Sequence, residues 1–391
     1  MLKNLSNRAL MCNLLRQEIA ATARMLVVKV GTRVLTHADG QLNEERIAGL
    51  AEDVTAAYQS GHRVVLVSSG AVGAGMSVLG LKQRPIDLAK LQAVAAVGQT
   101  NLIETYDRTF RKHGRRAAQV LLTADDISHR TRYLNVRNTL LSLLEFNAIP
   151  VINENDTVAV EELMTTFGDN DRLAALVTNL LRAQLLVILS DVDGLYNGDP
   201  GEPGSQVIPT VDRLNDAVRA LVRDRVTGLS KGGMASKLEA ARIVTMAGEN
   251  VIIAGGRHPG VLRRVLAGEE LGTLFLAQGK SVSPWKRWIG FSARPHGRML
   301  LDAGAVRAVS EQGRSLLAIG IVAAEGDFSK GDVVGLCDER GQEIARGLTN
   351  YPAADIQRIM GLPSNRIAQV LGHRPYEEVI HRDNLTLVGG G

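Results

Sequence analysis

The sequence is poor in cysteine and in aromatic residues, and neither sign of charge is in large excess. Cys12 and Cys337 form neither a metal-binding motif nor a disulfide framework, which is typical of a protein in a reducing cytoplasm. The 45 basic and 41 acidic residues leave a net charge of +4, which gives no reason to expect a nucleic-acid partner. No stretch is long and apolar enough to span a membrane, so we expect no membrane partner and a cytoplasmic location.

The length of 391 residues exceeds the usual size of a single hydrophobic core, so we expect two domains. Residues 25–280 would form the larger domain and residues 281–391 the smaller one, after a connector rich in polar residues. Residues 1–24 combine basic residues with apolar residues at roughly helical spacing, and no secretory cleavage site is visible. We expect them to form an N-terminal extension with a frayed or loosely docked helix.

Short apolar runs alternate with helical patterns throughout the larger domain. Strands buried on both faces read as continuous apolar runs, and their alternation with helices is typical of a mostly parallel sheet. The predicted fold class is therefore α/β, a three-layer αβα sandwich around an open, mostly parallel sheet. In residues 281–391 the apolar runs are short and are interrupted by Gly and Asp, which indicates a small β-rich domain. The expected strands of the larger domain lie at residues 25–30, 63–69, 117–123, 148–153, 185–190 and 251–256.

Two lysine-containing clusters lie at places where an anion could bind. Lys29 lies inside the first predicted strand, and the turn at Gly31 can direct backbone N–H groups at an anion. The sequence TGLSKGGMASK, residues 227–237, leads into a predicted helix, and a helix N-terminus is a ready anion site. Either cluster alone is equally compatible with a solvated lysine. Together they predict a phosphate site.

Two further clusters also follow predicted strands, where ligands of parallel sheets bind. The small residues of SSGAVGAGM, residues 68–76, would let the backbone approach a ligand closely, or would serve a tight turn with close helix packing. The pattern is not G-x-G-x-x-G, and the chain has no G-x-x-x-x-G-K-[ST], so neither common nucleotide motif applies. In LSDVDGLY, residues 189–196, we expect Asp191 at the same edge of the sheet.

The segment VINENDTVAVEELMTTFGDND, residues 151–171, gathers six carboxylates and three amides after an apolar run. Carboxylates repel phosphate, so this segment suits a ligand with an ammonium group and further hydrogen-bonding atoms, such as a small amino acid. A phosphate site and an amino-acid site in one domain predict a kinase that acts on an amino acid.

Seven motifs stand here in the order and spacing of the amino acid kinase family: VVKVGTRVLT, VSSGAVGAG, AAVGQ, VINEND, FGDNDRLAAL, SDVDGLY and GGMASK. Within this family the chain resembles the members that phosphorylate the γ-carboxylate of L-glutamate with ATP, the first step of proline biosynthesis. The tail resembles a PUA domain through LLDAGAVRAV, GRSLLAIGIV and GDFSKGDVV. The resemblance implies Mg²⁺ with ATP, a homo-oligomer (dimer or tetramer) and feedback inhibition by proline.

The same resemblance assigns roles to individual residues. It implies that Lys29 and Lys237 contact the transferring phosphoryl group and that Asp171 positions both lysines, with no protein ligand to a metal. It implies glutamate binding by Ser69, Gly70, Asn153, Asp156 and Asn170. It implies ATP binding by Lys29, Gly31, Ser190, Asp191, Lys231, Gly232, Gly233, Met234, Ala235, Ser236 and Lys237.

Lys231 departs from the family pattern, which usually has a small residue there, and the segment 157–168 looks longer than in many members. A kinase for another acidic amino acid is an alternative, and it would differ in the residues between 153 and 171. An RNA-binding or RNA-modifying protein is an alternative from another class, because PUA domains occur in such proteins. The tail argues against RNA, since its 13 basic and 12 acidic residues give a net charge of only +1.

Overall fold

The protein is described here by a computed structural model, which covers residues 14–37, 39–158, 170–222, 233–278, 283–372 and 376–388. The chain divides into two compact units. The first lies within residues 1–127 and 131–280, and the second within residues 128–130 and 281–391. Across the described ranges, every helix is too short or too polar to cross a membrane.

The first unit is built on an eight-stranded sheet in the order β3-β4-β2-β1-β5-β7-β8-β6. All pairs are parallel except β7 with β8, which confirms the predicted open, mostly parallel sheet. The two shortest strands, β6 and β8, were not expected from the sequence. The strands are β1 (Met25–Val30), β2 (Arg63–Ser68), β3 (Arg116–Leu122), β4 (Ala148–Glu154), β5 (Leu185–Ser190), β6 (Thr210–Val211), β7 (Asn250–Gly255) and β8 (Thr273–Phe275).

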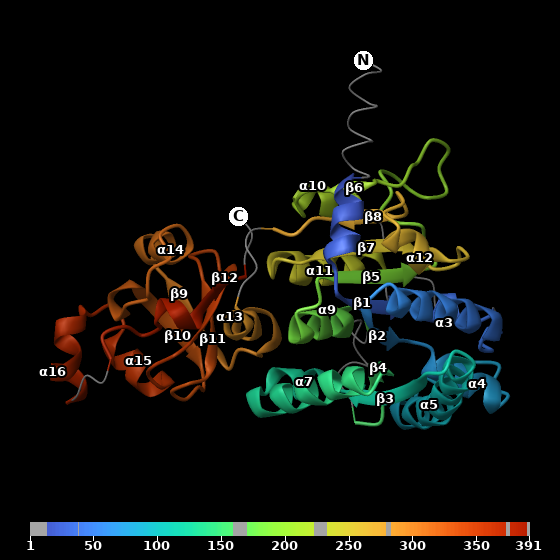
Figure 1. The fold of residues 1–391 in the computed structure, drawn as a ribbon. Helices are drawn as coiled ribbons and strands as arrows, with labels where there is room; N and C mark the ends of the chain where they lie inside the picture. The colour runs from blue at the N-terminus through green and yellow to red at the C-terminus, as the bar shows by residue number, and fades with distance from the viewer. Residues whose placement is uncertain are drawn as a thin grey trace, which may run out of the picture. The chain divides into compact units, whose positions relative to one another are not determined.

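Helices cover both faces of this sheet, so the three-layer αβα sandwich is confirmed. Figure 1 shows α7, α9 and α11 on one face and α3, α5 and α12 on the other. The helices are α2 (Thr32–Leu35), α3 (Glu44–Gln59), α4 (Ala71–Val78), α5 (Leu88–Arg111), α6 (Ala124–Ser128), α7 (Arg130–Glu145), α9 (Asn170–Leu181), α10 (Asp216–Arg219), α11 (Met234–Met246) and α12 (Val261–Leu266).

Local sequence explains where the long helix α5 begins and which side it buries. The Asp87 side chain accepts a hydrogen bond from the Lys90 backbone N–H, which caps the first turn. Leu91, Ala95 and Leu102 recur at helical spacing and are buried, which places one stripe of α5 in the core of this unit. Each large apolar side chain buried in this way contributes roughly 1.5–3 kcal/mol.

The second unit is a five-stranded sheet in the order β10-β9-β11-β12-β13, around its own core of residues such as Met299, Leu336 and Ile356. The predicted small β-rich domain is therefore confirmed. The strands are β9 (Gly297–Leu301), β10 (Ile321–Gly326), β11 (Val333–Cys337), β12 (Glu343–Leu348) and β13 (Leu385–Leu387). The helices are α13 (Pro284–Arg287), η1 (Trp288–Ser292), α14 (Ala303–Ser310), η2 (Ala318–Gly320), α15 (Ala353–Ile359), η3 (Ser364–Arg366), α16 (Ile367–Leu371) and η4 (Arg382–Asn384).

The N-terminal extension is bound more firmly to the first unit than we expected. Residues 14–22 are helical, and the Arg16 side chain is buried, with 1% of the residue exposed. Its guanidinium donates hydrogen bonds to the backbone oxygens of Pro209 (2.6 Å), Leu271 (2.9 Å) and Gly272 (3.1 Å). The expectation of a frayed or loosely docked helix is therefore wrong for this segment. Sequence spacing could not show this burial, because the acceptors are backbone atoms distant in sequence.

We expect Arg16→Met to lower the free energy of unfolding by about 3 kcal/mol or more, because each buried carbonyl left without a donor costs roughly 1–3 kcal/mol. Denaturant unfolding would measure the change. Arg24→Met is the matched control, since Arg24 is an exposed arginine of the same segment. Equal stability of the two variants would contradict a structural role for the buried guanidinium.

Candidate functional site

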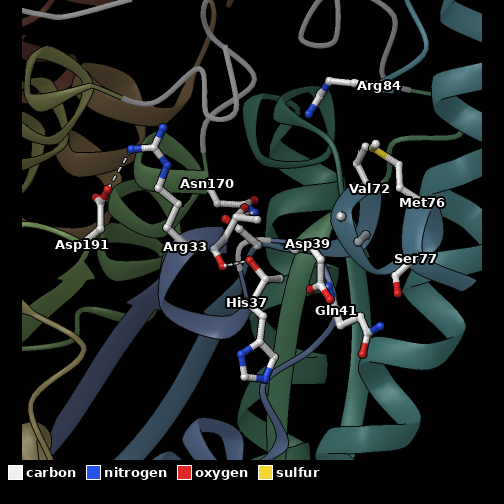
Figure 2. A pocket seen from close by; sticks show the side chains of 18 of the residues that line it. Arg33, His37, Asp39, Gln41, Val72, Met76, Ser77, Arg84, Asn170 and Asp191 are labelled. Carbon is white, nitrogen blue, oxygen red and sulfur yellow. Dashed lines mark hydrogen bonds and ion pairs between the residues drawn. The ribbon is translucent and has the colours of Figure 1, made fainter. Parts of the chain in front are cut away.

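A cleft of about 1010 Å³ opens at the carboxyl ends of the central strands of the first unit. Lys29 enters it from β1, Gly70 from the turn after β2, Asn153 from β4 and Asp191 from the turn after β5. Parallel strands end at one edge of a sheet, so the clusters that follow them meet there. Figure 2 shows the side chains that line this cleft.

Asp171, the second residue of α9, holds two lysines from different elements. One carboxylate oxygen lies 2.6 Å from Lys29 Nζ, and the other lies 3.0 Å from Lys237 Nζ on α11. Ser236 Oγ donates a further hydrogen bond of 3.1 Å to the same carboxylate. Asp171 is fully buried, while the two lysines are 3% and 6% exposed and still line the cleft. The three side chains predicted to act together are therefore in contact.

This arrangement carries a formal charge of +1, because one carboxylate faces two ammonium groups. Removal from water strengthens the attraction between these charges, and it also makes an uncompensated lysine costly. An anionic ligand in the cleft would meet both ammonium groups, because both lysines line it. The geometry suits the binding of a phosphoryl group.

A chain of buried amides borders the lysines. Asn170 Nδ2 donates hydrogen bonds to Asn153 Oδ1 and Ser69 Oγ, both at 2.9 Å. Asn153 Nδ2 in turn donates to Gln99 Oε1 at 2.8 Å. Asn170 Oδ1 is buried and has no hydrogen-bond donor among the described residues. Gln99, the last residue of AAVGQ, was not predicted as a site residue, although its motif was noted.

Asp156 lies half-buried on the wall of the same cleft. Burial raises the pKa of its carboxyl to about 6, and the positive charge of Arg84 opposes this increase. The carboxylate form therefore predominates above about pH 6 and would favour a cationic group of a ligand.

Asp191 stands on the opposite side, where nucleotide binding was predicted. Its carboxylate accepts a hydrogen bond of 3.2 Å from Ser190 Oγ and forms an ion pair of 3.0 Å with Arg33 Nη1 (Figure 2). Burial alone would raise the pKa of this carboxyl, but the hydrogen bonds and the charge of Arg33 hold it below its usual value. Arg33 also lines the cleft and was missed by sequence reasoning, because nothing in the pattern distinguishes it from a surface arginine.

The N–H of Gly31 itself takes part in the sheet, and the anion contact predicted for the other backbone N–H groups of this turn stays a prediction. The Gly31 N–H donates to the carbonyl oxygen of Leu189 at 3.1 Å, so it continues the pairing of β1 with β5 and is not directed at a ligand. Gly31 itself lies on the cleft wall.

Two glycines of residues 68–76 lie in different surroundings, one on the cleft and one between two helices. Gly70 has φ +113°, which favours glycine, and lines the cleft at the start of α4. Gly75 and Gly98 instead bring α4 and α5 together, since added Cβ atoms would lie 1.9 Å from the Val94 oxygen and 1.8 Å from the Ala71 oxygen.

The predicted nucleotide loop is covered only in part. Lys231 and Gly232 lie outside the described residues, as does most of the segment 157–168. Gly233 precedes α11, and Met234, Ala235 and Ser236 form its first turn. Of the loop residues described, Lys237 lines the cleft.

The sheet edge carries two lysines held by the carboxylate of Asp171, and buried amides lie beside them. Such a site in an α/β fold is typical of enzymes that transfer phosphoryl groups. The family model of the amino acid kinase family matches residues 24–255, and the PUA domain model matches residues 297–371. The chain therefore belongs to the amino acid kinase family.

Individual relatives are similar to this chain over nearly its whole length. A glutamate 5-kinase of Rhodopirellula baltica is 51% identical and covers 95% of this chain and 96% of its own. Glutamate 5-kinases of Methylococcus capsulatus and Moorella thermoacetica are 47% and 46% identical, over 93% and 94% of this chain and 97% of each relative.

We expect Asp171→Asn to lower the free energy of unfolding by about 3–5 kcal/mol, because two buried ammonium groups would lose the carboxylate charge that contacts both of them. The double variant Asp171→Asn with Lys29→Met should recover part of this loss, since it removes one of the two uncompensated charges. Denaturant unfolding of the three proteins would measure both effects. Wild-type stability in Asp171→Asn would show that the carboxylate does not hold the lysines.

Proposed function

We propose that the chain acts as a glutamate 5-kinase, transferring the γ-phosphoryl group of ATP to the γ-carboxylate of L-glutamate, the first step of proline biosynthesis. The observation that carries the proposal is the contact of Asp171 with both Lys29 and Lys237, in a cleft that both lysines and Asp156 line. The similarity to relatives named glutamate 5-kinase, which extends over nearly their whole length, supports the proposal.

The chemistry requires charge neutralisation more than proton transfer. The attacking carboxylate is already ionised at neutral pH, so no general base is needed. Both the nucleophile and the γ-phosphate are anions, and their approach has to be aligned and shielded. Lys29 and Lys237 supply positive charge to the travelling phosphoryl group, and Asp171 keeps their two ammonium groups together.

Glutamate would lie between Asp156 and the two lysines. Asp156 would pair with its ammonium group, and Ser69, Gly70, Asn153 and Asn170 would surround its remaining length. ATP would approach from the side of Asp191, with the following residues in contact: Lys29, Gly31, Ser190, Asp191, Lys231, Gly232, Gly233, Met234, Ala235, Ser236 and Lys237. For Gly31 this contact would be through its Cα and carbonyl rather than its N–H.

A divalent metal accompanies ATP in kinases of this kind, and we propose Mg²⁺. In the described part of the chain no group of three or more His, Cys, Asp or Glu side chains could hold a metal ion. Mg²⁺ commonly binds through substrate phosphates, water and one or two carboxylates, so Asp191 on the nucleotide side fits such a partial coordination. The ion would neutralise charge on the β- and γ-phosphate oxygens.

Other parts of the proposal rest on the family resemblance alone. These are assembly into a dimer or tetramer, feedback inhibition by proline, and a location in the cytoplasm, where ATP and glutamate are available. The RNA-binding alternative is not favoured, because the tail has a net charge near zero and the relatives are named as kinases.

ADP release measured with glutamate, aspartate and N-acetylglutamate in parallel tests the function. We expect turnover with glutamate and little with the other two, and we expect Lys237→Ala to lower kcat by about 100-fold or more, as loss of one transition-state contact typically does. Preference for aspartate would support the alternative acidic amino acid, and an unchanged kcat in Lys237→Ala would remove this lysine from the mechanism.

The raised pKa of Asp156 predicts how glutamate use depends on pH. A carboxyl with a pKa of about 6 loses its charge as the pH falls through that value, so kcat/KM for glutamate should fall below pH 6 in the wild type. Asp156→Asn should lower kcat/KM about ten- to a hundredfold at pH 8 and remove this dependence. The KM for ATP should barely change. Identical pH profiles of the two proteins would exclude Asp156 as the ammonium partner.

A further inference from the structure

Arg84 is a charged residue of the cleft to which neither the motifs nor the proposed mechanism gives a role. It lies between α4 and α5, in the sequence LKQRPID, and lines the same cleft as Asp156 and Asn170. Figure 2 shows Arg84 at the edge of the cleft, on a different element from Asn170 and Asp191. The sequence alone makes it look like a solvated loop residue.

Arg84 and Asp156 carry opposite charges on one cleft but do not pair with each other. Among the residues that the structure describes, neither side chain has an ion-pair partner within 4.0 Å. Both side chains line the same cleft, and burial raises the pKa of the Asp156 carboxyl while the positive charge of Arg84 lowers it. A cation site and an anion site separated by a gap match a ligand that carries both charges on one carbon.

We propose that Arg84 binds the α-carboxylate of the amino acid substrate while Asp156 binds its α-ammonium group. The proposal rests on the proposed function and makes Arg84 a specificity-determining residue. Arginine suits this task because its planar guanidinium can donate two parallel hydrogen bonds to a carboxylate. With the head group held in this way, the side-chain carboxylate of the substrate extends towards Asn170 and the two lysines.

The proposed contact can be tested from both sides. The substrate can be changed so that it lacks the negative charge of the α-carboxylate, and the enzyme can be changed so that it lacks the positive charge of Arg84. L-Isoglutamine keeps the γ-carboxylate and the ammonium group of glutamate but carries a neutral amide in place of the α-carboxylate. We expect the wild type to prefer glutamate by about ten- to a hundredfold in kcat/KM, the usual effect of one charge-assisted contact. If the turnover of isoglutamine is too slow to measure, its inhibition constant as a competitor of glutamate is measured in place of kcat/KM.

Arg84→Gln should lower kcat/KM for glutamate by about the same factor and leave kcat/KM for isoglutamine unchanged. The kcat at saturating glutamate should stay near the wild-type value. Arg84→Lys should recover part of the loss. Lys90→Gln is the matched control, because it removes an exposed positive charge of the adjoining helix that does not line the cleft, and it should behave like the wild type.

If Arg84→Gln lowered kcat/KM equally for glutamate and isoglutamine, or for neither, the proposed contact of Arg84 with the α-carboxylate would be wrong. Equal use of the two substrates by the wild type would overturn it as well. These outcomes differ from failure of the proposed function, which would appear as a wild-type enzyme that releases no ADP with glutamate.

Discussion

The carboxylate of Asp171 is the group on which the order of the site depends. Two ammonium groups held close together in a buried place repel each other strongly, and the carboxylate of Asp171 contacts both and offsets this repulsion. The lysines come from β1 and α11, so this carboxylate also ties two distant parts of the chain to the start of α9. The neighbouring residue Asn170 organises the amides on the other side. Two adjacent residues at one helix start therefore order both the cationic and the amide part of the cleft.

The sheet and its helix packing make this arrangement possible. Parallel strands deliver Lys29, Gly70 and Asn153 to the same edge, and the neighbouring helices determine how the turns between them run. The close contact of α4 with α5, which excludes a Cβ atom at Gly75 and Gly98, fixes the helix that follows the Gly70 turn. Side chains far from the chemistry are in this way part of the geometry of the cleft.

Much of the fold was predictable from the sequence, because buried parallel strands leave long apolar runs that are easily recognised. The joint role of Lys29, Asp171 and Lys237 was expected from the family resemblance, whereas the convergence of strand ends predicted only that the clusters following the strands lie at one edge of the sheet. The two-residue strand β6 has no periodicity to recognise. The burial of Arg16 and the use of the Gly31 N–H could not be predicted, because their partners are backbone oxygens distant in sequence. Arg84 has no motif at all, and its position on the cleft emerges only from the folded chain.

The order of the strands also sets the order in which the proposed substrates lie. β4, β2, β1 and β5 are consecutive neighbours, and each step across a sheet is about 4.8 Å. Asn153 is the second-last residue of β4, Lys29 lies two strands away on β1, and Asp191 follows β5, one strand further. An amino acid over β4 and β2, a phosphoryl group over β1 and a nucleotide over β5 would thus lie in a row across the strand ends. In-line transfer requires such a row, so under the proposed function the topology would align the two substrates before any side chain contributes.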